Sequence, residues 1–466
     1  MRSNNRRQFM QTGLALGTAF WVARGARAES PNEKIRFASV GVDGKGSSDM
    51  GDAASRGSMT AVCDVDRNRL DAKANDLSSA HPDVQKFTDF RVMFEELADK
   101  IDAFTVSTPD HTHAPAAALG MRLGKHCFCQ KPLTHSISEA RLLGQLAREK
   151  DLKTQMGNQG TAESSLRRAA TLIRNGVLGR VKEVHVWTNR PIWAQGCDRP
   201  EADPNGAPDN LDWDLWLSTA PARPYAGGYH PFSWRGWGDF GTGALGDMAC
   251  HTVNMPFMGL DIADPLWVQA ETSGHNRDSY PNWSTIECEF PKNDWREGFQ
   301  FFWYDGGKKV DRRLVLECLS EEEVNGRTRR GQVSASGVLV VGEKDSMYAP
   351  GDYAENGFRL ASGETKWNDF DEFEKSPGHF EEWFQAIRGE RSEARSNFPS
   401  YAGPLTETIL LGNLAVYAAP EAGAKGQKVE WNAKDLKVLN DEADGALSRI
   451  VHKSYTEGFD PFKIGT

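Results

Sequence analysis

The chain has 466 residues, enough for two or three domains, and its 39% hydrophobic and 26% charged residues are typical of globular proteins and exclude a disordered chain. The formal net charge of −10 argues against a nucleic-acid-binding protein, because nonspecific affinity for phosphate backbones requires a positive field. The seven cysteines are spread through the chain, and we expect them to be unpaired rather than to staple a small domain.

The first 28 residues have the features of an export signal. A pair of arginines at 6–7 precedes an apolar run over 12–22, and residues 26–28 offer a small-x-small cleavage site. Residues 5–10 resemble the twin-arginine motif, so we expect periplasmic export of a folded protein by that route rather than by the general one. A stable membrane anchor is not expected, because the run is shorter than the about 20 residues that span a bilayer.

From residue 34 onward, short apolar runs alternate with amphipathic stretches. The expected strands cover residues 35–42, 59–65, 101–107, 126–130 and 153–157, and the expected helices cover residues 47–55, 67–79, 114–123 and 136–150. Strands that alternate with helices at this spacing need crossover connections, which are typical of parallel sheets. We therefore predict an α/β unit over residues 34–158, with a doubly wound parallel sheet.

The pattern changes after residue 158. The expected strands cover residues 181–188, 266–273, 284–290 and 298–304, with a hairpin at 337–341 and 346–348; helices are expected at 164–175, 379–388 and 406–419. This order predicts a second, α+β domain over 159–466, with an open, mostly antiparallel sheet covered by helices on one side. The exposed face of such a sheet favours a homo-oligomer, either a dimer or a tetramer.

A glycine-rich turn follows the first expected strand. It comprises Gly41, Asp43, Gly44, Lys45 and Gly46, and it joins that strand to the first helix. This is the context of the dinucleotide fingerprint, which is typical of a Rossmann domain. In it, the start of the helix offers unpaired N–H groups to a pyrophosphate. The turn departs from the usual pattern because an aspartate replaces the middle glycine, although an extra glycine follows it.

Asp64 ends the second expected strand, 18 residues after Gly46. A carboxylate at this position accepts hydrogen bonds from the ribose hydroxyls of an adenosine and repels a 2′-phosphate. The residue therefore predicts NAD rather than NADP, although Arg67 nearby leaves room for NADP. The alternative interpretation is an ordinary turn followed by a solvated aspartate.

Three further motifs follow in order along the chain: Thr108-Pro109-Asp110-His111-Thr112-His113, Gln130-Lys131-Pro132, and Asp247-Met248-Ala249-Cys250-His251. With this set, the chain resembles the glucose–fructose oxidoreductase/inositol dehydrogenase (Gfo/Idh/MocA) family from residue 34 to the end. The resemblance implies that Thr108, Pro109, His113, Gln130 and Lys131 contribute to the cofactor site. Gln130 stands where the family has glutamate, which removes a negative charge beside the nicotinamide.

Lys131, Asp247 and His251 have the chemistry that oxidation of a secondary alcohol requires. Lys131 follows a parallel strand, at the edge where such sheets bind ligands. Asp247 and His251 are four residues apart on an expected helix, so they share one face. We predict His251 as the main general acid/base, Asp247 as a positioning carboxylate, and Lys131 as the donor to the reacting hydroxyl. The alternatives are a surface lysine and a structural Asp–His hydrogen bond; no metal site is expected, because a third ligand is missing.

A tryptophan-rich segment, with six tryptophans between residues 187 and 237, is expected to shape the substrate pocket. Aromatic faces pack against sugar C–H groups, while arginines bind hydroxyls or carboxylates. We predict Arg190, Trp193, Arg235 and Trp237 as substrate-binding residues and a carbohydrate or polyol as the substrate. Residues 212–217 are expected to form a short helix that buries its two tryptophans.

The export signal and the dinucleotide turn together suggest a cofactor that stays bound, because free NAD is scarce outside the inner membrane. The first hypothesis is an exported oxidoreductase that acts on a sugar or polyol hydroxyl. The second is a redox-neutral, NAD-dependent glycoside hydrolase or lyase that oxidises a hydroxyl transiently. The third is a noncatalytic sugar- or nucleotide-binding protein, which the Asp43 and Gln130 departures favour.

Overall fold

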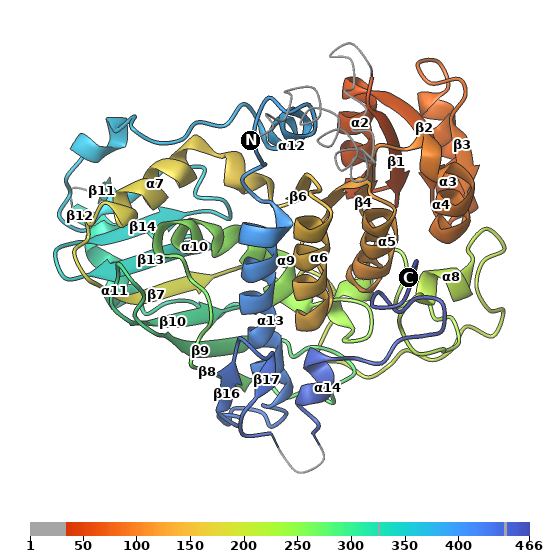
Figure 1. The fold of residues 1–466 in the computed structure, drawn as a ribbon. Coiled ribbons are helices and arrows are strands. Elements are labelled where there is room, and N and C mark those ends of the chain that lie inside the picture. Colours follow the sequence, from red (N-terminus) through yellow and green to blue (C-terminus); the bar gives the residue numbers. More distant parts are fainter. Residues whose placement is uncertain (1–33, 325–326, 442–444) are drawn as a thin grey trace, which may run out of the picture. The chain divides into compact units, whose positions relative to one another are not determined.

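The computed structural model describes residues 34–324, 327–441 and 445–466 (Figure 1). The predicted export signal over residues 1–28 lies outside these ranges. Within them, no helix combines the length and apolar character needed to cross a bilayer. The seven cysteines all lie in the described part and are free; six are buried, and Cys197 is exposed.

The first domain is built on a six-stranded parallel sheet with the order β3-β2-β1-β4-β5-β6. Its strands are β1 (Arg36–Val40), β2 (Ser58–Cys63), β3 (Gln85–Phe87), β4 (Ala103–Val106), β5 (His126–Cys129) and β6 (Thr154–Met156). Its helices are α2 (Lys45–Arg56), α3 (Arg67–Leu77), α4 (Phe90–Leu97), α5 (Asp110–Arg122) and α6 (Ile137–Glu149). The predicted doubly wound sheet is confirmed. The sequence did not indicate β3, because this three-residue edge strand has two exposed polar residues and no apolar alternation.

Alternate residues of the parallel strands pack on opposite faces of the sheet, as the pleat requires. Phe37 and Phe128 contact one core, which includes residues of α2, α3 and α12 (His379–Ile387). Ala38 and Phe104 contact the other core, which includes residues of α4 and α5. α12, far along the chain, therefore completes one face of the first sheet.

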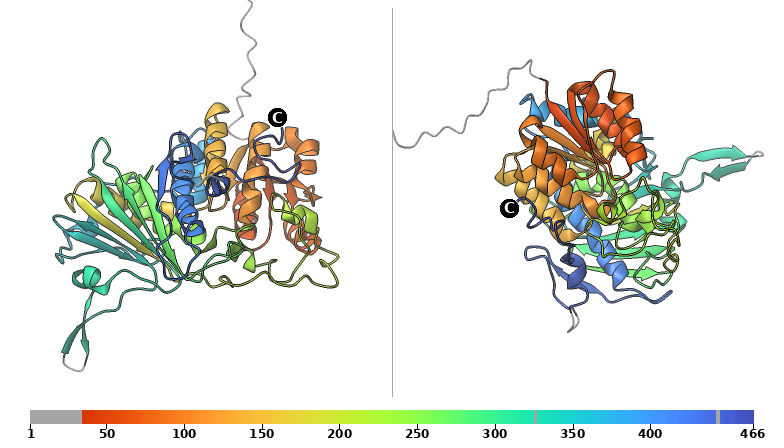
Figure 2. Two further views of the ribbon diagram at one scale, coloured as in Figure 1. Left: turned by 90° about the horizontal axis from the view of Figure 1, so that it is seen from below. Right: turned by 90° about the vertical axis from the view of Figure 1, so that its right-hand side faces the viewer.

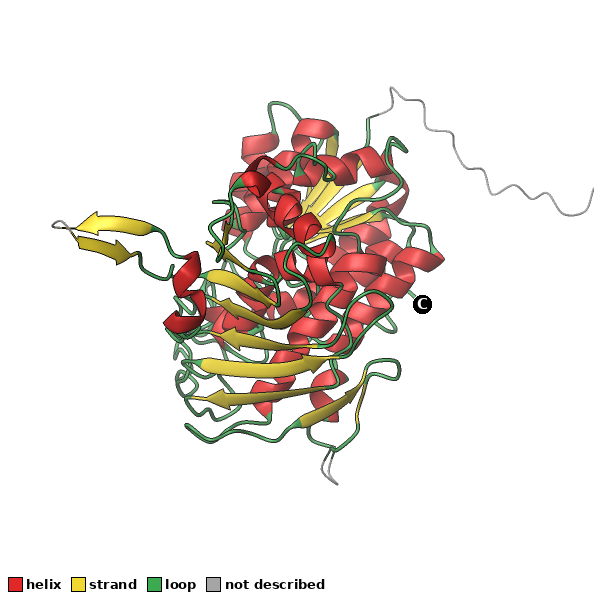
Figure 3. Ribbon diagram, turned by 90° about the vertical axis from the view of Figure 1, so that its left-hand side faces the viewer, coloured by secondary structure: helices red, strands yellow, loops and turns green. Residues whose placement is uncertain are grey.

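The second domain contains a nine-stranded sheet with the order β15-β14-β13-β7-β10-β9-β8-β16-β17, in which only β7 and β10 pair in parallel. Its strands are β7 (Val181–Trp187), β8 (Trp267–Thr272), β9 (Ser284–Phe290), β10 (Phe299–Tyr304), β13 (Gly337–Gly342), β14 (Ser346–Pro350), β15 (Arg359–Leu360), β16 (Val429–Asn432) and β17 (Lys437–Val438). Figure 3 shows helices behind these strands and an open face in front. The open, mostly antiparallel sheet is thus confirmed.

The other helices of the second part of the chain are α7 (Ser164–Arg174), α8 (Trp213–Leu217), α9 (Gly243–Thr252), α10 (Asn254–Leu260), α11 (Arg312–Val315), α13 (Gly403–Tyr417) and α14 (Ser448–Val451). Most of them share a core with one face of this sheet, whereas α8 packs in a separate aromatic cluster and α11 packs against the opposite face of the sheet. α13 is apolar almost all round, because it packs against β8 and β9 on one side and against α6 and α9 on others. It therefore lies between the two sheets, as Figure 1 shows.

A separate hairpin, β11 (Glu321–Val324) with β12 (Arg327–Arg330), projects away from the nine-stranded sheet in both views of Figure 2. The sequence pattern did not indicate it. Its strands consist mostly of charged residues, so they lack the apolar alternation by which a half-buried strand is recognised.

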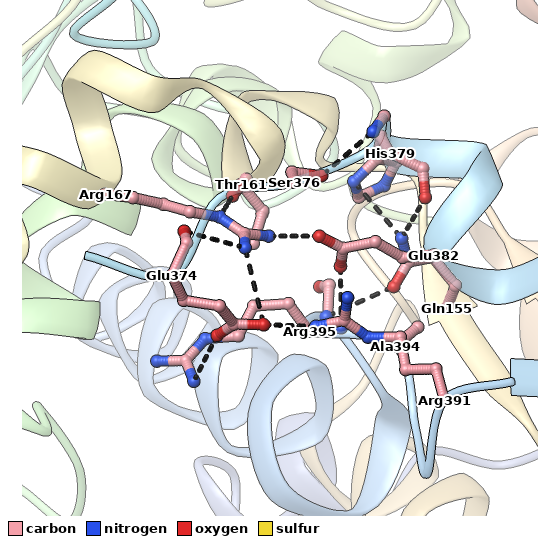
Figure 4. A network of polar contacts seen from close by, with 12 residues as sticks. Gln155, Thr161, Arg167, Glu374, Ser376, His379, Glu382, Arg391, Ala394 and Arg395 are labelled. Carbon is pink, nitrogen blue, oxygen red and sulfur yellow. Dashed lines mark hydrogen bonds and ion pairs between the residues drawn. The ribbon is translucent and has the colours of Figure 1, made fainter. Parts of the chain in front are cut away.

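A buried polar network ties α7 to α12 (Figure 4). The guanidinium of Arg167 pairs with the carboxylate of Glu382, and both side chains are almost fully buried. Glu382 also accepts a hydrogen bond from the backbone N–H of Arg395, at 3.0 Å. The neighbouring Gln155, at the end of the first sheet, donates to the carbonyl of His379 at 2.6 Å. This network joins the second domain to a helix that covers the first sheet.

Candidate active site

A cavity of about 520 Å³ lies at the carboxyl edge of the parallel sheet. The loops that follow β1, β2, β4 and β5 line one side of it, and residues of α9 and of the chain between β7 and β8 line the other. In parallel α/β sheets this edge is where ligands bind. Its lining includes both the predicted cofactor turn and the predicted catalytic residues.

The predicted cofactor turn lines the cavity through Gly41, Asp43, Gly44 and Lys45. Gly41 has a φ of +78°, and a side chain there would meet the backbone of Ser107 at 2.6 Å. Gly44 also has a positive φ and faces open space, so a ligand can approach its backbone closely. Gly46, which was also predicted to bind the cofactor, does not line the cavity. A Cβ at Gly46 would lie 2.2 Å from the carbonyl oxygen of Gly41, so its role is to let α2 start against the turn.

Asp43, which replaces the usual middle glycine, does not leave a bare negative charge in the turn. Its carboxylate forms an ion pair with Arg69, which also lines the cavity. The guanidinium offsets the repulsion that this carboxylate would exert on a pyrophosphate. Arg69 was missed in the sequence, because only the fold brings α3 beside the turn.

Asp64 lies at the end of β2 and lines the cavity. Its two carboxylate oxygens accept hydrogen bonds from the backbone N–H groups of Val42, at 3.1 Å, and Asp66, at 3.0 Å. Burial raises the pKa of this carboxyl, and the same two hydrogen bonds oppose the rise. The side chain is therefore held in the place where a Rossmann domain binds the adenosine ribose.

Gln130 lines the cavity and is buried. Its amide donates to Asp49 Oδ2 at 2.8 Å, and Asp49 also accepts from the hydroxyl of Ser107 at 2.8 Å and pairs with Lys45. A glutamate at 130 would place two carboxylates in contact. Gln130, which stands where the family has glutamate, thus supplies an amide donor to the Asp49 carboxylate.

Thr108 and Pro109 line the cavity, but His113 does not. α5 begins at Asp110, earlier than expected, so His113 lies in a helix and is fully buried. Its ring nitrogens lie 2.8 Å from the carbonyl oxygen of Pro132 and 2.9 Å from that of Thr108. His113 therefore joins the loops after β4 and β5, which border the cavity.

Lys131 and Asp247 meet across the cavity. The Lys131 ammonium lies 2.6 Å from Asp247 Oδ1, and Arg235 Nε lies 3.3 Å from the same oxygen. Arg190 Nε lies 3.7 Å from Asp247 Oδ2. Although burial opposes ionisation, Lys131 and Arg235 hold the pKa of the Asp247 carboxyl far below its ordinary value. Asp247 is thus an anion surrounded by three cations.

His251 lies four residues after Asp247 on α9 and lines the same cavity. Its Nδ1 has no hydrogen-bond partner among the described residues. Burial, and then the charge of Lys131, lower the pKa of this imidazole well below its ordinary value. A neutral imidazole with an unpaired nitrogen can accept a proton.

Tyr353 packs edge-on against His251, with ring centroids 4.7 Å apart and an interplanar angle of 83°. It also lines the cavity, from the loop between β14 and β15. The sequence carries no signal for it, because it lies in an irregular stretch about 100 residues from α9.

The predicted substrate residues divide into two groups. Arg190 and Arg235 line the cavity, together with Trp234, which belongs to the tryptophan-rich segment but was not predicted as a substrate-binding residue. Trp193 lies near Arg235 but outside the lining, and Trp237 is buried beside Tyr229, with ring centroids 5.3 Å apart. Trp237, although predicted to bind substrate, therefore lies outside the cavity lining. A short 3-10 helix, Ser233–Gly236, carries Trp234 and Arg235 to the cavity, and Trp237, the extended residue after it, turns into an aromatic core.

Residues 209–237 cover the cavity from the second domain. Main-chain hydrogen bonds join Asp212 N–H to the carbonyl of Val65, at 3.0 Å, and Arg67 N–H to that of Asn210, at 2.8 Å. α8 buries Trp216 as expected, and Trp216 stacks on Trp213, but Trp213 itself is only half-buried. The segment is thus hydrogen-bonded to Val65 and Arg67, which follow Asp64 in the chain, and it covers the cavity on that side.

Two sequence models of one family match the chain. The first is described as an oxidoreductase family with an NAD-binding Rossmann fold and matches residues 35–158; the second is the C-terminal alpha/beta domain of that family and matches residues 163–300. Together they cover more than half of the chain.

Among curated relatives, levoglucosan dehydrogenase of Pseudarthrobacter phenanthrenivorans is 26% identical over 155 residues, which are 33% of this chain and 32% of that protein. D-xylose 1-dehydrogenase [NADP(+)] of Haloarcula marismortui is 26% identical over 162 residues, which are 34% of this chain and 44% of that one. The chain thus matches about a third to less than half of the length of these relatives.

Among solved structures, the WlbA dehydrogenase of Bordetella pertussis, in complex with NADH and UDP-GlcNAcA, aligns with a TM-score of 0.56 at 17% identity over 84% of this chain and 98% of that one. An inositol dehydrogenase homolog of Azotobacter vinelandii, in complex with NADH and myo-inositol, aligns with a TM-score of 0.52 at 16% identity over 86% and 98%. These likenesses show the fold. With both family models matched, the chain belongs to the Gfo/Idh/MocA oxidoreductase family.

Proposed function

We propose that the protein is an NAD-dependent oxidoreductase that acts on a secondary hydroxyl of a sugar or polyol. One observation carries the proposal: Lys131, Asp247 and His251 converge on the cavity that also contains the glycine turn and Asp64. The turn fits a dinucleotide, because it combines glycines at positive φ with a guanidinium that offsets Asp43. NAD, when bound there, supplies the hydride acceptor.

The residues of this chain bind the substrate, stabilise the charge on its oxygen and accept its proton. The ammonium of Lys131 donates to the substrate oxygen and stabilises the charge that develops on it. Neutral His251 accepts the hydroxyl proton, and Asp247 keeps the Lys131 ammonium in place. Arg190 and Arg235 bind further oxygens of the substrate. The named substrates and ligands of the relatives, which include levoglucosan, D-xylose and myo-inositol, favour a carbohydrate.

The cofactor is proposed to be NAD and to remain bound through the catalytic cycle. Asp64 favours NAD over NADP, since its carboxylate would repel a 2′-phosphate. Retention is supported by the cover formed by residues 209–237 and by the twin-arginine-like sequence at residues 5–10, typical of proteins exported to the periplasm after folding. We also propose a homo-oligomer, a dimer or tetramer that pairs the open face of the nine-stranded sheet.

The first test is mass spectrometry of the supernatant after denaturing protein purified without added cofactor. Near-stoichiometric NAD or NADH is the expected result; an empty protein that also binds no added NAD would contradict the proposal. Sugar-dependent reduction of the cofactor, lost in Lys131→Ala and His251→Ala, tests the enzyme assignment. Release of a chromogenic aglycone without net NADH would instead favour the redox-neutral glycoside hydrolase or lyase.

A further inference from the structure

One end of the cavity is closed by a residue from a remote segment of the chain. Beyond Asp64, the lining consists of Thr88, Asp89 and Phe90, which follow β3, and of Phe459. A dinucleotide whose pyrophosphate lies on the glycine turn and whose ribose lies at Asp64 directs its adenine away from Lys131, toward this end. The structure therefore places an aromatic ring from residues 453–466 at the expected adenine site.

Phe459 is buried and fixed by aromatic and cationic neighbours. Its ring meets that of Phe90 edge-on, with centroids 6.1 Å apart and an interplanar angle of 64°. The guanidinium of Arg91 lies 4.2 Å from the same ring centroid, on its π system. Arg91 is itself held by the carboxylate of Asp89. The Phe459 ring is thus a buried part of the cavity lining, held by Phe90 and Arg91.

The segment that carries Phe459 is anchored on both sides of it. After it, Arg122 on α5 donates to the carbonyls of Pro461, at 2.7 Å, and Ile464, at 2.8 Å. Before it, the hydroxyl of Thr456 donates to the carbonyl of Ala220 at 3.0 Å, and Lys453 lies 3.3 Å from the buried carboxylate of Glu139. These contacts reach the first domain and the segment that covers the cavity.

We propose that Phe459 forms one wall of an adenine-binding site and that the 453–466 segment thereby controls how fast the dinucleotide leaves. The inference rests on the proposed function, because it requires a dinucleotide in the cavity. An adenine base offers a flat π face and polar edges, and an aromatic wall holds such a base by stacking and exclusion of water. Loss of a stacking contact between a base and an aromatic side chain weakens binding by about fivefold to a hundredfold.

The test compares Phe459→Ala with Phe462→Ala. Phe462 lies in the same segment, is 41% exposed and does not line the cavity, so it is a matched control. The exchange rate of bound NADH against excess NAD is measured in a stopped-flow instrument by the loss of energy transfer from tryptophan to NADH. We expect exchange to be about 5- to 100-fold faster in Phe459→Ala and unchanged in Phe462→Ala.

Fragments of the cofactor locate the effect. Affinity for ADP is expected to fall in Phe459→Ala by a similar factor, while affinity for nicotinamide mononucleotide stays that of the wild type. If Phe459→Ala does not fold, Phe459→Leu, which keeps an apolar side chain without the aromatic face, decides the question. Wild-type exchange rates in the folded variant, or equal losses for both fragments, overturn the inference alone. A wild-type protein that binds no dinucleotide overturns the proposed function as well.

Discussion

The ammonium of Lys131, two residues after β5 of the first domain, lies 2.6 Å from the carboxylate of Asp247 on α9 of the second. This ion pair joins the two domains where the substrate carbon would lie. Because Arg190 and Arg235 also approach Asp247, the carboxylate stays ionised and keeps the ammonium at one position. The reacting end of the cavity therefore depends on correct docking of both domains.

Lys131 and His251 are expected to act as a unit. Lys131→Ala and His251→Ala should each lower kcat by about 10²- to 10⁴-fold, the usual contribution of a proton-transferring group. The double variant should lose little more than the worse single variant, because each group serves the same transition state. Steady-state kinetics at saturating cofactor measure this. Additive losses, or a loss of NAD binding that accounts for the effect, would contradict the assignment.

The pH dependence of the reaction should reflect the buried state of His251. Burial and the charge of Lys131 lower the pKa of its imidazole well below the ordinary value of 6.5, so the base stays neutral at pH 7. The acidic limb of kcat/KM should therefore lie below pH 6.5 in the wild type. In Lys131→Met one lowering charge is gone, and the limb should move to higher pH. A limb that does not move would argue against His251 as the titrating base.

Gln130 and Asp49 form a pair that can be tested by a double-mutant cycle. Gln130→Glu places a second carboxylate against Asp49 and removes an amide donor, so it should lower the free energy of unfolding by about 1 to 3 kcal/mol. Asp49→Asn combined with Gln130→Glu restores one donor and one acceptor and should recover most of that loss. Urea denaturation of the four proteins measures the coupling. Equal destabilisation in both backgrounds would contradict the pairing.

Asp64 should govern the choice of dinucleotide. Asp64→Ala removes an anchored acceptor of charge-assisted hydrogen bonds, so the Kd for NAD should rise about 10- to 100-fold. The Kd for NADP should stay the same or fall, because the repulsion of the 2′-phosphate is gone. Calorimetric titration measures both values, and Asp71→Ala, on the exposed side of α3, serves as the control. A parallel loss for both cofactors would place the carboxylate away from the ribose.

The Arg167–Glu382 pair should stabilise the protein strongly. Arg167→Ala leaves a buried carboxylate without its cation and should lower the free energy of unfolding by about 3 to 5 kcal/mol at pH 7.5. In the wild type, burial opposes ionisation of Glu382, but the hydrogen bond from Ser376 and the charge of Arg167 outweigh it and lower the pKa.

That lowered pKa fixes the sign of the pH effect. The stability contributed by Glu382 is present above its ordinary pKa of 4.5 and is lost as pH falls through the lower folded value. Without Arg167 the folded pKa should rise, so the difference between wild type and Arg167→Ala should shrink from pH 7.5 to pH 4. Urea denaturation at both pH values measures it, and a difference that grows at acid pH would contradict this account.

Features that depend on neighbours in the chain were predictable. The alternation of strands and helices up to residue 158 and the turn from Gly41 to Gly46 are local patterns, and so is the spacing of Asp247 and His251. Each is imposed by backbone geometry within a few residues: a pleat of period two, a helix of 3.6 residues per turn, and a tight turn that needs glycine. These parts of the prediction therefore agree with the structure.

Features that depend on which surfaces pack together in the folded protein were not predictable from the sequence. Trp237 and Trp234 belong to the same tryptophan-rich pattern, yet one is core and the other lines the cavity, because Trp234 lies in a 3-10 helix and the backbone becomes extended at Trp237, directly after it. Arg69, Tyr353 and Phe459 reach the cavity from α3, from the β14–β15 loop and from the 453–466 segment. The sequence alone determined the two sheets, the cofactor turn and the catalytic candidates, since short-range periodicity encodes them. Only the tertiary structure decided what closes the cavity, because long-range packing chooses among many side chains of the same type.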